Sequence, residues 1–253
     1  MGFIKFLGSA GARFVVMKQL RASGGAWLKF KSTNLIIDPG PGAIVKVNSC
    51  RPKLDPCKLD AIILTHKHLD HSGDVNVMIE AMTEGGFKKR GALFIPADAL
   101  GADGVVFSYL KNHPKEITIL NQGKFSIGDI SFEVPIVNLH SVMTYGLKFY
   151  LGKEVVSFVS DTRYFDGLID AYKNSTLIIL NVVFYDKRKD YDHLCLDDAI
   201  KIIEAIKPKK AVLTHFGMSM LKNKPHILEE QLRAKLKTDI KFAYDGFKVD
   251  LKV

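Results

Sequence analysis

The chain has 253 residues, of which 47% are hydrophobic and 25% are charged. This composition is typical of a soluble globular protein, and the length suits one large domain. The chain contains no low-complexity segment, no Ser- or Pro-rich linker and no internal repeat at a fixed period. We therefore predict a single domain over residues 1–253.

Charge and cysteine content narrow the class of protein further. Lys and Arg number 36 and Asp and Glu number 27, which gives a net charge of +9. A basic balance favours an anionic substrate such as a phosphodiester or nucleic acid, although a lysine-rich solubilising surface explains it equally well. The cysteines form no CxxC pair, the N-terminus has no apolar signal core, and the longest apolar stretch, 177–184, is too short to span a bilayer. We expect reduced thiols, no membrane contact and a cytoplasmic location.

Apolar runs and stretches with helical spacing follow one another along the chain. The pattern predicts strands at 34–38 and 61–65, a helix at 75–82, strands at 132–137, 155–159 and 176–180, a helix at 196–206, a strand at 211–214 and a helix at 226–236. The helix at 196–206 has the clearest apolar stripe and ends at Lys207-Pro208. This mixture predicts an α/β fold in which helices cover the faces of sheets.

Residues able to bind metals follow several of the predicted strands. Asp38, the segment 65–71, His140, Asp161 and His215 each come directly after an apolar run. Side chains at matching strand ends meet on one rim of a sheet, where functional residues usually lie. We therefore expect these residues to converge.

The segment Thr65-His66-Lys67-His68-Leu69-Asp70-His71 is the most specific motif. His66 and His68 are two residues apart, so they point the same way if the chain is extended. A turn after them can aim Asp70 and His71 at a second point. Imidazole and carboxylate groups suit Zn²⁺, and a carboxylate can bridge two ions. Two ions about 3.5–4 Å apart can share a hydroxide that attacks an electrophile.

One loop offers too few ligands for two ions, and the later strand ends supply the others. The candidate metal ligands, which include five of the eight histidines, are His66, His68, Asp70, His71, His140, Asp161 and His215. Each of the last three could by itself be an ordinary core or surface residue, but their order and placement favour ligands. We predict a dinuclear zinc hydrolase, and the same ligands would also accept Mn²⁺ or Fe.

Together these residues resemble those of the metallo-β-lactamase superfamily. The resemblance rests on THKHLDHSGD at 65–74, on Asp38-Pro39-Gly40 and on the later ligand candidates His140, Asp161 and His215. It covers essentially the whole chain. It implies an α+β fold, the four-layer αββα sandwich, with the site at one edge of the paired sheets. It also implies a division of the ligands: His66, His68 and His140 hold one zinc, Asp70, His71 and His215 hold the other, and Asp161 bridges them. Asp38 would orient the ligand loop from outside.

A second motif, Asp192-His193-Leu194-Cys195, opens the predicted helix at 196–206. It is similar to the His-Leu-Thr/Ser motif of ribonuclease Z and of the phosphoribosyl cyclic phosphate phosphodiesterase. The similarity implies that His193 acts as a general acid or binds phosphate during phosphodiester cleavage. We count Asp70 and His193 as the catalytic residues.

Two residues depart from the pattern of that group. Asn181 stands where the ribonuclease has a Glu that pairs with the motif histidine. Asn181 can still hydrogen-bond His193, but because it is neutral it would not raise the imidazole pKa as a carboxylate does. Cys195 replaces the Ser or Thr that would cap the helix, which predicts a weaker cap.

Basic residues beside aromatic ones could bind nucleic acid. Their pattern is less specific than that of the metal motif. The variable stretch 85–124 contains the run 88–90 and, later, Phe107, Tyr109 and Lys111, at a density that favours a solvated loop. Lys187 lies in the basic run 187–189 before His193 and could contact a substrate phosphate or form a charged loop tip. Glycines at 8–11 and 24–25 would let the backbone approach the site closely.

We weigh four functions against the pattern. The favoured one is a dinuclear zinc phosphodiesterase acting on a small cyclic phosphate, a nucleotide or RNA. The alternative is a hydrolase of the same fold acting on lactones, thioesters or other carboxylic esters and amides. A diiron redox protein of this fold would have HxExD, and Lys67-His68 does not provide the Glu, while a non-catalytic binding module would not need a full ligand set. We also allow for a homodimer, the commonest assembly.

Overall fold

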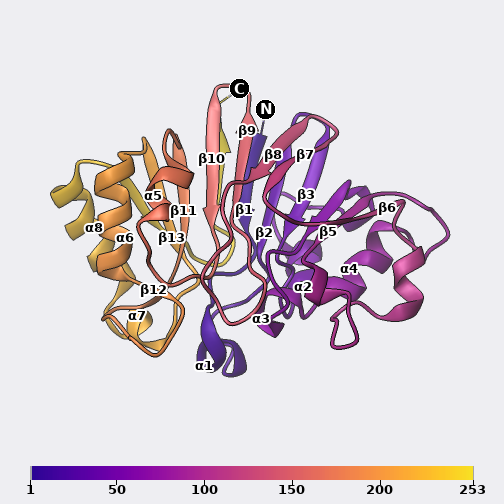
Figure 1. The fold of residues 1–253 in the computed structure, drawn as a ribbon, viewed down its shortest axis with the longest axis horizontal. Helices are drawn as coiled ribbons and strands as arrows, with labels where there is room; N and C mark the ends of the chain where they lie inside the picture. The colour runs from indigo at the N-terminus through magenta and orange to yellow at the C-terminus, as the bar shows by residue number, and fades with distance from the viewer. Residues whose placement is uncertain (1, 253) are drawn as a thin grey trace.

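Two mixed β-sheets face each other in the computed structural model, which describes residues 2–252 (Figure 1). The first sheet has the order β15-β1-β2-β3-β4-β5-β6, and the second has the order β14-β13-β11-β10-β9-β8-β7, with β12 paired to β11. The strands are β1 Gly2–Phe6, β2 Ala26–Phe30, β3 Thr33–Ile37, β4 Ala61–Ile63, β5 Ala92–Ile95, β6 Glu116–Ile119, β7 Gly123–Ile127, β8 Ile130–Val134, β9 Leu147–Leu151, β10 Glu154–Val159, β11 Leu177–Phe184, β12 Leu194–Cys195, β13 Lys210–Thr214, β14 Asp239–Phe242 and β15 Lys248–Leu251. Strands β3 to β6 are parallel, as are β10, β11, β13 and β14.

Helices cover the outer face of each sheet. Along residues 2–252 the helices are α1 Ala12–Met17, α2 Ala43–Ser49, α3 Leu69–Ser72, α4 Val75–Met82, α5 Gly167–Tyr172, α6 Leu196–Ile206, α7 Met218–Lys222 and α8 Pro225–Leu236, with the 3₁₀ turns η1 Pro56–Lys58, η2 Ala97–Ala99 and η3 Ser108–Asn112. One apolar cluster joins α2 and α4 to the first sheet, and another joins α5, α6 and α8 to the second. A third cluster lies between the sheets. These layers confirm the predicted αββα sandwich.

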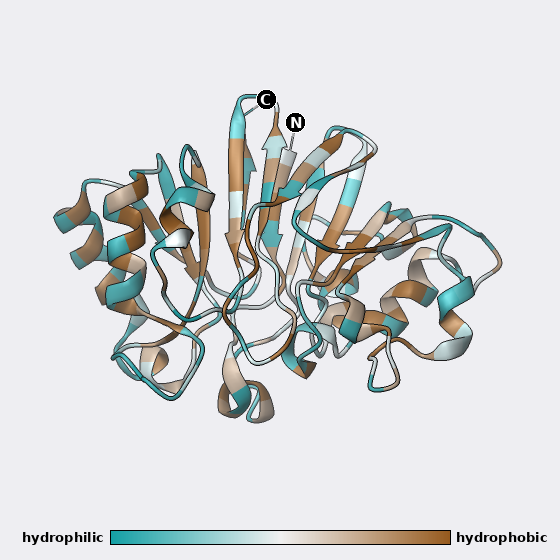
Figure 2. Ribbon diagram, viewed as in Figure 1, coloured by the Kyte–Doolittle hydropathy of each residue, from teal (hydrophilic) through white to brown (hydrophobic). Residues whose placement is uncertain are grey.

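Strand β11 shows why its sequence is apolar without interruption. Leu177 and Ile179 belong to the cluster between the sheets, whereas Ile178 and Leu180 belong to the cluster under the helices. Successive side chains of a strand point to opposite faces, so a strand that is covered on both sides must be apolar at every position. Figure 2 shows the resulting hydrophobic bands along the strands and the alternating bands on α6.

The predicted elements agree with the structure, with one difference that affects the site. Helices α4 and α6 have the predicted bounds, and α8 begins one residue early. The strand predicted at 132–137 ends at Val134, because Pro135 has no N–H to continue the ladder. His140 therefore lies on a loop and not, as expected, at the end of a strand.

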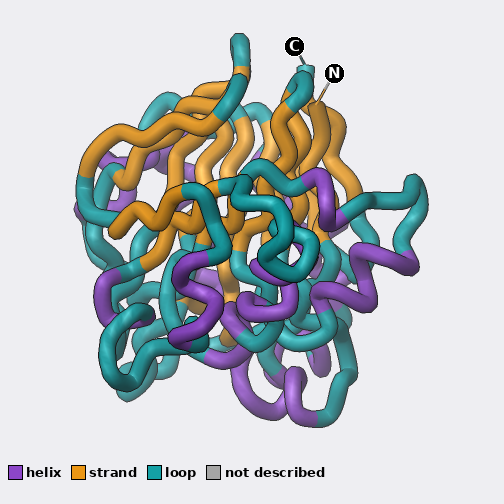
Figure 3. Tube along the Cα trace, turned by 90° about the vertical axis from the view of Figure 1, so that its right-hand side faces the viewer, coloured by secondary structure: helices purple, strands orange, loops and turns teal. Residues whose placement is uncertain are grey.

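Both termini lie at one end of the sheets, and loops and short helices gather at the other end (Figures 1 and 3). Helix α3 belongs to this loop-rich end, which we call the loop end (Figure 1). Across residues 2–252, no helix combines the length and the apolar character needed to cross a membrane.

Candidate metal centre

Parallel strands from both sheets deliver ligand-type side chains to the loop end. Asp38 follows β3, Asp161 follows β10 and His215 follows β13. Asp38 and His215 have the left-handed φ values of 52° and 61°. This conformation costs a non-glycine residue on the order of 1–3 kcal/mol, and such strain is concentrated at functional sites. At both positions the chain turns sharply as soon as its strand ends.

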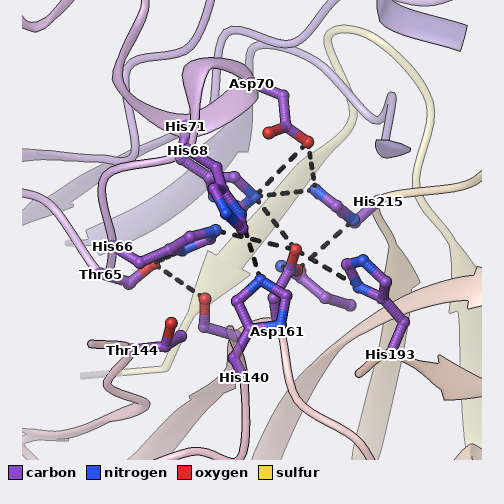
Figure 4. A network of polar contacts seen from close by, with 12 residues as sticks. Thr65, His66, His68, Asp70, His71, His140, Thr144, Asp161, His193 and His215 are labelled. Carbon is purple, nitrogen blue, oxygen red and sulfur yellow. Dashed lines mark hydrogen bonds and ion pairs between the residues drawn. The ribbon is translucent and has the colours of Figure 1, made fainter. Parts of the chain in front are cut away.

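The motif at 65–71 passes from an extended loop into the short helix α3. The rings of His66 and His68 lie 4.9 Å apart, and both contact His140, at 5.2 and 4.9 Å between ring centroids. Helix α3 then brings His71 to 4.7 Å from His215, while the His71 ring also lies 4.0 Å from that of His66. The chain therefore turns after His68, and His71 contacts both halves of the site (Figure 4).

His140 is held by the loop that replaces the predicted strand end. The Asn138 N–H donates to the Thr144 carbonyl at 2.9 Å and closes the base of this loop. The Asn138 side chain donates to the Asp161 carbonyl at 3.1 Å, and the Leu139 N–H donates to the Thr162 hydroxyl at 3.1 Å. The loop is therefore tied directly to the segment that carries Asp161.

Ligand atoms gather in four overlapping groups at the loop end. Within each group, the ring nitrogens and carboxylate oxygens lie within 4.8 Å of one another. The groups are His66-His68-His140, His66-His71-Asp161, Asp70-His71-His215 and His140-Asp161-His193. The structure thus brings together all seven sequence-predicted ligands, and it places His193 among them.

Asp161 lies at the centre of these groups. Its Oδ2 is 3.9 Å from His66 Nε2, 3.5 Å from His71 Nε2 and 3.4 Å from His193 Nδ1. Its Oδ1 is 3.5 Å from His215 Nδ1. One carboxylate therefore faces members of all four groups, which is the position that a bridging ligand needs.

Several nitrogens of the cluster lack protein partners. His66 Nε2, His193 Nδ1 and His215 Nδ1 are buried, and no group among residues 2–252 forms a hydrogen bond with them. Buried polar atoms without partners are costly and rare. Divalent cations would accept their lone pairs, and nitrogen and carboxylate donors are the set that zinc prefers. The histidines and carboxylates of the cluster are therefore suited to hold metal ions.

Burial and neighbouring charge act in opposite ways on two of the histidines. Burial lowers the pKa of His66 well below its ordinary value, and the nearby His71 adds to this effect. Burial also opposes the protonation of His71, but the carboxylates of Asp161, Asp70 and Asp38 outweigh it and raise the His71 pKa well above its ordinary value. The three carboxylates thus favour positive charge at His71, as they would favour a bound cation.

Asp161 and His193 are shifted by the same surroundings. Burial raises the pKa of Asp161, but the charges of His215, His71 and His193 hold it well below its ordinary value. Burial lowers the pKa of His193 to about 4, despite the neighbouring carboxylate of Asp161. Asp161 is therefore ionised and His193 is neutral near pH 7.

Hydrogen bonds from outside the cluster orient its members. Asp38 Oδ2 accepts from His71 Nδ1 at 2.9 Å and from the Thr65 hydroxyl at 2.7 Å, as expected for a residue that orients the ligand loop. The Thr65 hydroxyl also lies 3.1 Å from His66 Nδ1 and 2.8 Å from the Ser160 hydroxyl. We did not predict a role for Thr65 or Ser160, although both adjoin ligands in the sequence.

Asn181, which could have supported His193, forms no hydrogen bond with it. The Asn181 amide donates instead to Asp161 Oδ1 at 2.8 Å. Asn181 lies on β11, next to β10 in the sheet, and β10 leads directly into Asp161. Asn181 therefore supports the central carboxylate and not the motif histidine.

The N-terminal glycines approach the site as expected. A Cβ on Gly11 would collide with His215 Nδ1, and a Cβ on Gly40, which follows β3, would likewise collide with the Asp70 carbonyl. Only glycine allows such close contacts. Lys187, which we considered as a substrate contact, is exposed on the loop between β11 and β12.

Comparison with known proteins agrees with the geometry. A family model described as a beta-lactamase superfamily domain matches residues 33–216. The uncharacterized protein MJ1374 of Methanocaldococcus jannaschii is 29% identical over 98% of this chain and 94% of its own length. The probable metallo-hydrolase YhfI of Bacillus subtilis is 26% identical over 89% of this chain and 91% of its own length.

Solved structures share the fold over the whole chain. The crystal structure of YhfI, a metallo-beta-lactamase fold protein, superposes with a TM-score of 0.81 at 23% identity and covers 98% of both chains. A diphosphatase from the PhnP family superposes with a TM-score of 0.75 at 18% identity, over 100% of this chain and 99% of its own.

Proposed function

The chain belongs to the beta-lactamase superfamily, and from this premise we propose that it is a two-metal hydrolase that cleaves phosphodiesters. The position of Asp161 carries the two-metal part of the proposal. Its two carboxylate oxygens face His66, His71, His193 and His215 at 3.4 to 3.9 Å. A single ion would not need so many ligands around one bridging carboxylate.

Zinc suits this ligand set best. In our assignment His66, His68 and His140 would hold one ion, Asp70, His71 and His215 would hold the other, and Asp161 would serve both. When bound, two such ions supply an activated water and stabilise negative charge on the substrate. The protein's own part is to keep His66 and His71 in fixed orientations through Thr65 and Asp38.

His193 favours phosphodiesters among the possible substrates. It lies 3.4 Å from Asp161 and 5.1 Å from the His140 ring, so a substrate bound at the cluster would contact it. A neutral imidazole there can donate a hydrogen bond to a phosphate oxygen or take part in proton transfer to the leaving oxygen. The net charge of +9 also suits an anionic substrate. The similarity to a diphosphatase points to the same chemistry.

Metal content and substrate turnover together test the proposal. The purified protein would be analysed for zinc, manganese and iron, and then assayed with bis-p-nitrophenyl phosphate, a cyclic nucleotide, a lactone and nitrocefin, each with and without chelator. We expect close to two metal ions per chain and chelator-sensitive turnover of a phosphodiester. Lactone turnover without phosphodiester turnover would instead establish the carboxylic-ester hydrolase. Absence of all three metals would contradict both.

A His193→Ala variant tests the role of the motif histidine. We expect the variant to keep its metal ions, because the other ligands remain, and to lose roughly 100-fold or more in phosphodiesterase kcat. Metal analysis and steady-state kinetics on the same sample measure both effects. The matched control is His226→Ala, at an exposed histidine of α8, which should keep full activity. Unchanged kcat in His193→Ala would refute the role.

A further inference from the structure

The loop between β11 and β12 carries aromatic and basic side chains beside the metal cluster. It spans 185–193 and lies next to β12 and α7 in Figure 1. The rings of Tyr191 and Phe184 are 5.5 Å apart, and Phe184 is 5.9 Å from His193. His193 in turn is 5.1 Å from the metal-ligand candidate His140. A row of rings thus leads from the solvent to the cluster.

The outer end of this row is open. Tyr191 is 56% exposed and Phe184 is half-buried. The two rings are inclined at 60°, so they are not stacked on each other, and the exposed Tyr191 ring offers area to a ligand. Exposed aromatic faces of this kind can accept a flat ring from a ligand, because offset or tilted ring contacts are favourable at such separations.

Positive charge accompanies the rings. The Arg188 guanidinium lies 5.9 Å from the centre of the Phe184 ring, and Lys187 and Lys189 are exposed on either side of it in the chain. Arginine stacks on aromatic faces and also pairs with phosphate. Aromatic rings combined with a basic surface are the means by which proteins hold single nucleotides and unpaired strands.

The loop is anchored at both ends, to the cluster at one and to α7 at the other. His140 Nδ1 donates to the Asp192 carbonyl at 3.0 Å, and Asp192 forms an ion pair with Arg163 at 3.5 Å. At the other end, the Tyr185 N–H donates to the Ser219 hydroxyl at 3.1 Å. Tyr191, Asp192 and His193 follow one another, so the exposed ring is held at a fixed place relative to the metal ligands.

We propose that Phe184, Arg188 and Tyr191 form a stacking platform for a nucleobase, attached to the phosphodiester that is cleaved at the cluster. The inference rests on the proposed phosphodiesterase function and narrows its substrate to nucleotides or oligonucleotides. In this arrangement the base stacks on Tyr191 and Phe184, the basic side chains of the loop attract the phosphate, and His193 lies between the base and the cluster. The platform selects the substrate and takes no part in the chemical step.

Two dinucleotide substrates test the platform directly. The first is thymidylyl-(3′→5′)-thymidine, and the second is the same molecule lacking both bases, so that the cleaved bond is matched in the two. Products are separated by chromatography to obtain kcat and KM for each. We expect the wild-type protein to prefer the base-bearing substrate by about tenfold or more in kcat/KM, the size expected for one stacked base.

Substitutions then locate the source of the preference. Tyr191→Ala should raise KM for the base-bearing substrate about tenfold with kcat unchanged, and should leave the abasic substrate unaffected. Tyr191→Phe keeps the ring and should behave as the wild type. The matched control is Tyr109→Ala, which removes a tyrosine of similar exposure, 59%, from another surface ring pair. This control should keep the base preference.

The outcomes separate this inference from the proposed function. Cleavage of both dinucleotides at equal efficiency would overturn the platform and leave the phosphodiesterase intact. An equal loss with both substrates in Tyr191→Ala would also overturn it, because the ring would then only support the loop. If neither dinucleotide is cleaved, calorimetry with thymidine 5′-monophosphate and inorganic phosphate decides. Tighter binding of the nucleotide that is lost in Tyr191→Ala supports the platform, and equal binding of the two overturns it.

Discussion

The hydroxyl of Thr65 has three polar neighbours and only one proton to donate. An ionised carboxylate can only accept, so Thr65 donates to Asp38 Oδ2 at 2.7 Å. The Ser160 hydroxyl at 2.8 Å and His66 Nδ1 at 3.1 Å must then donate to Thr65. His66 therefore carries its proton on Nδ1 and leaves Nε2, the buried atom without a partner, free to bind a metal. Thr65 sets the tautomer of a ligand without touching the metal.

A Thr65→Val variant should weaken metal binding while it preserves shape. Valine fills the same volume but cannot accept the proton of His66 or donate to Asp38. Loss of an outer hydrogen bond to a metal ligand typically costs 10- to 100-fold in metal affinity, and we expect a loss in that range for Zn²⁺. Competition with a chromophoric chelator measures it.

Thr65→Ser is the matched control for this prediction, because it keeps the hydroxyl and should retain most of the affinity. A Thr65→Val protein with unchanged affinity for Zn²⁺ but a lower melting temperature would show that Thr65 only supports the packing.

At the scale of elements, the N-terminus of α6 has an unusual cap. Cys195 replaces the expected Ser or Thr, and in the structure Asp198 completes the cap from the first turn of the helix. Its carboxylate accepts from the Cys195 N–H at 3.1 Å and lies 3.2 Å from the thiol sulfur. A helix N-terminus ordinarily lowers a thiol pKa. Here burial dominates and raises the pKa of Cys195 to about 11.

Cys195 should therefore be unreactive in the folded protein. At pH 8 we expect iodoacetamide to alkylate the half-exposed Cys50 and to leave Cys195 unmodified, because its thiol is buried and protonated. Denaturant should make both react. Mass spectrometry of the digested protein measures each site. Equal alkylation of Cys50 and Cys195 in the folded protein would contradict the burial of the Cys195 thiol.

The raised pKa of Cys195 also predicts how the stability of the fold depends on alkaline pH. The folded value of about 11 exceeds the ordinary value of 9.0. The neutral thiol thus contributes stability below pH 9, and this contribution disappears as the pH rises towards 11. Cys195→Ala should remove this contribution to the pH dependence. Urea unfolding of the wild type and the variant at pH 8 and pH 10.5 would measure the free energy of unfolding of each.

At the scale of the whole molecule, the candidate ligands connect the two sheets at the loop end. His66 and His71 follow a strand of the first sheet, whereas Asp161 and His215 follow strands of the second. Bound ions would therefore join the sheets across the sandwich. They would also balance the negative charge of the carboxylates that raise the pKa of His71.

Removal of metal should lower the melting temperature markedly. A ligand present at 1,000 times its Kd stabilises the folded state by about 4 kcal/mol, which corresponds to about 10 °C for a chain of this size. We expect a rise of that order when Zn²⁺ is added to chelator-treated protein. Scanning calorimetry measures the shift.

The His226→Ala control should show the same shift as the wild type, and Asp161→Ala should lose most of it. No shift with Zn²⁺, Mn²⁺ or Fe²⁺ would contradict a metal site that joins the two sheets.

The sequence by itself determined the chemistry of the site and the layers of the fold. His66, His68, Asp70 and His71 lie within one short segment, so their residue types and spacing reveal metal binding without knowledge of the fold. The strands were predictable because a strand covered on both faces must be apolar at every position. The αββα arrangement followed from a family resemblance carried by the same motif.

Only the tertiary structure decided which side chains meet. Asn181 supports Asp161 and not His193, because the neighbouring β10 places Asp161 beside it. Thr65 meets Ser160 across 95 residues of chain, through contact between the two sheets. Such partners depend on strand order, register and sheet packing, which are set by the whole apolar core. A local pattern can name the ligands, but the core decides which groups orient them.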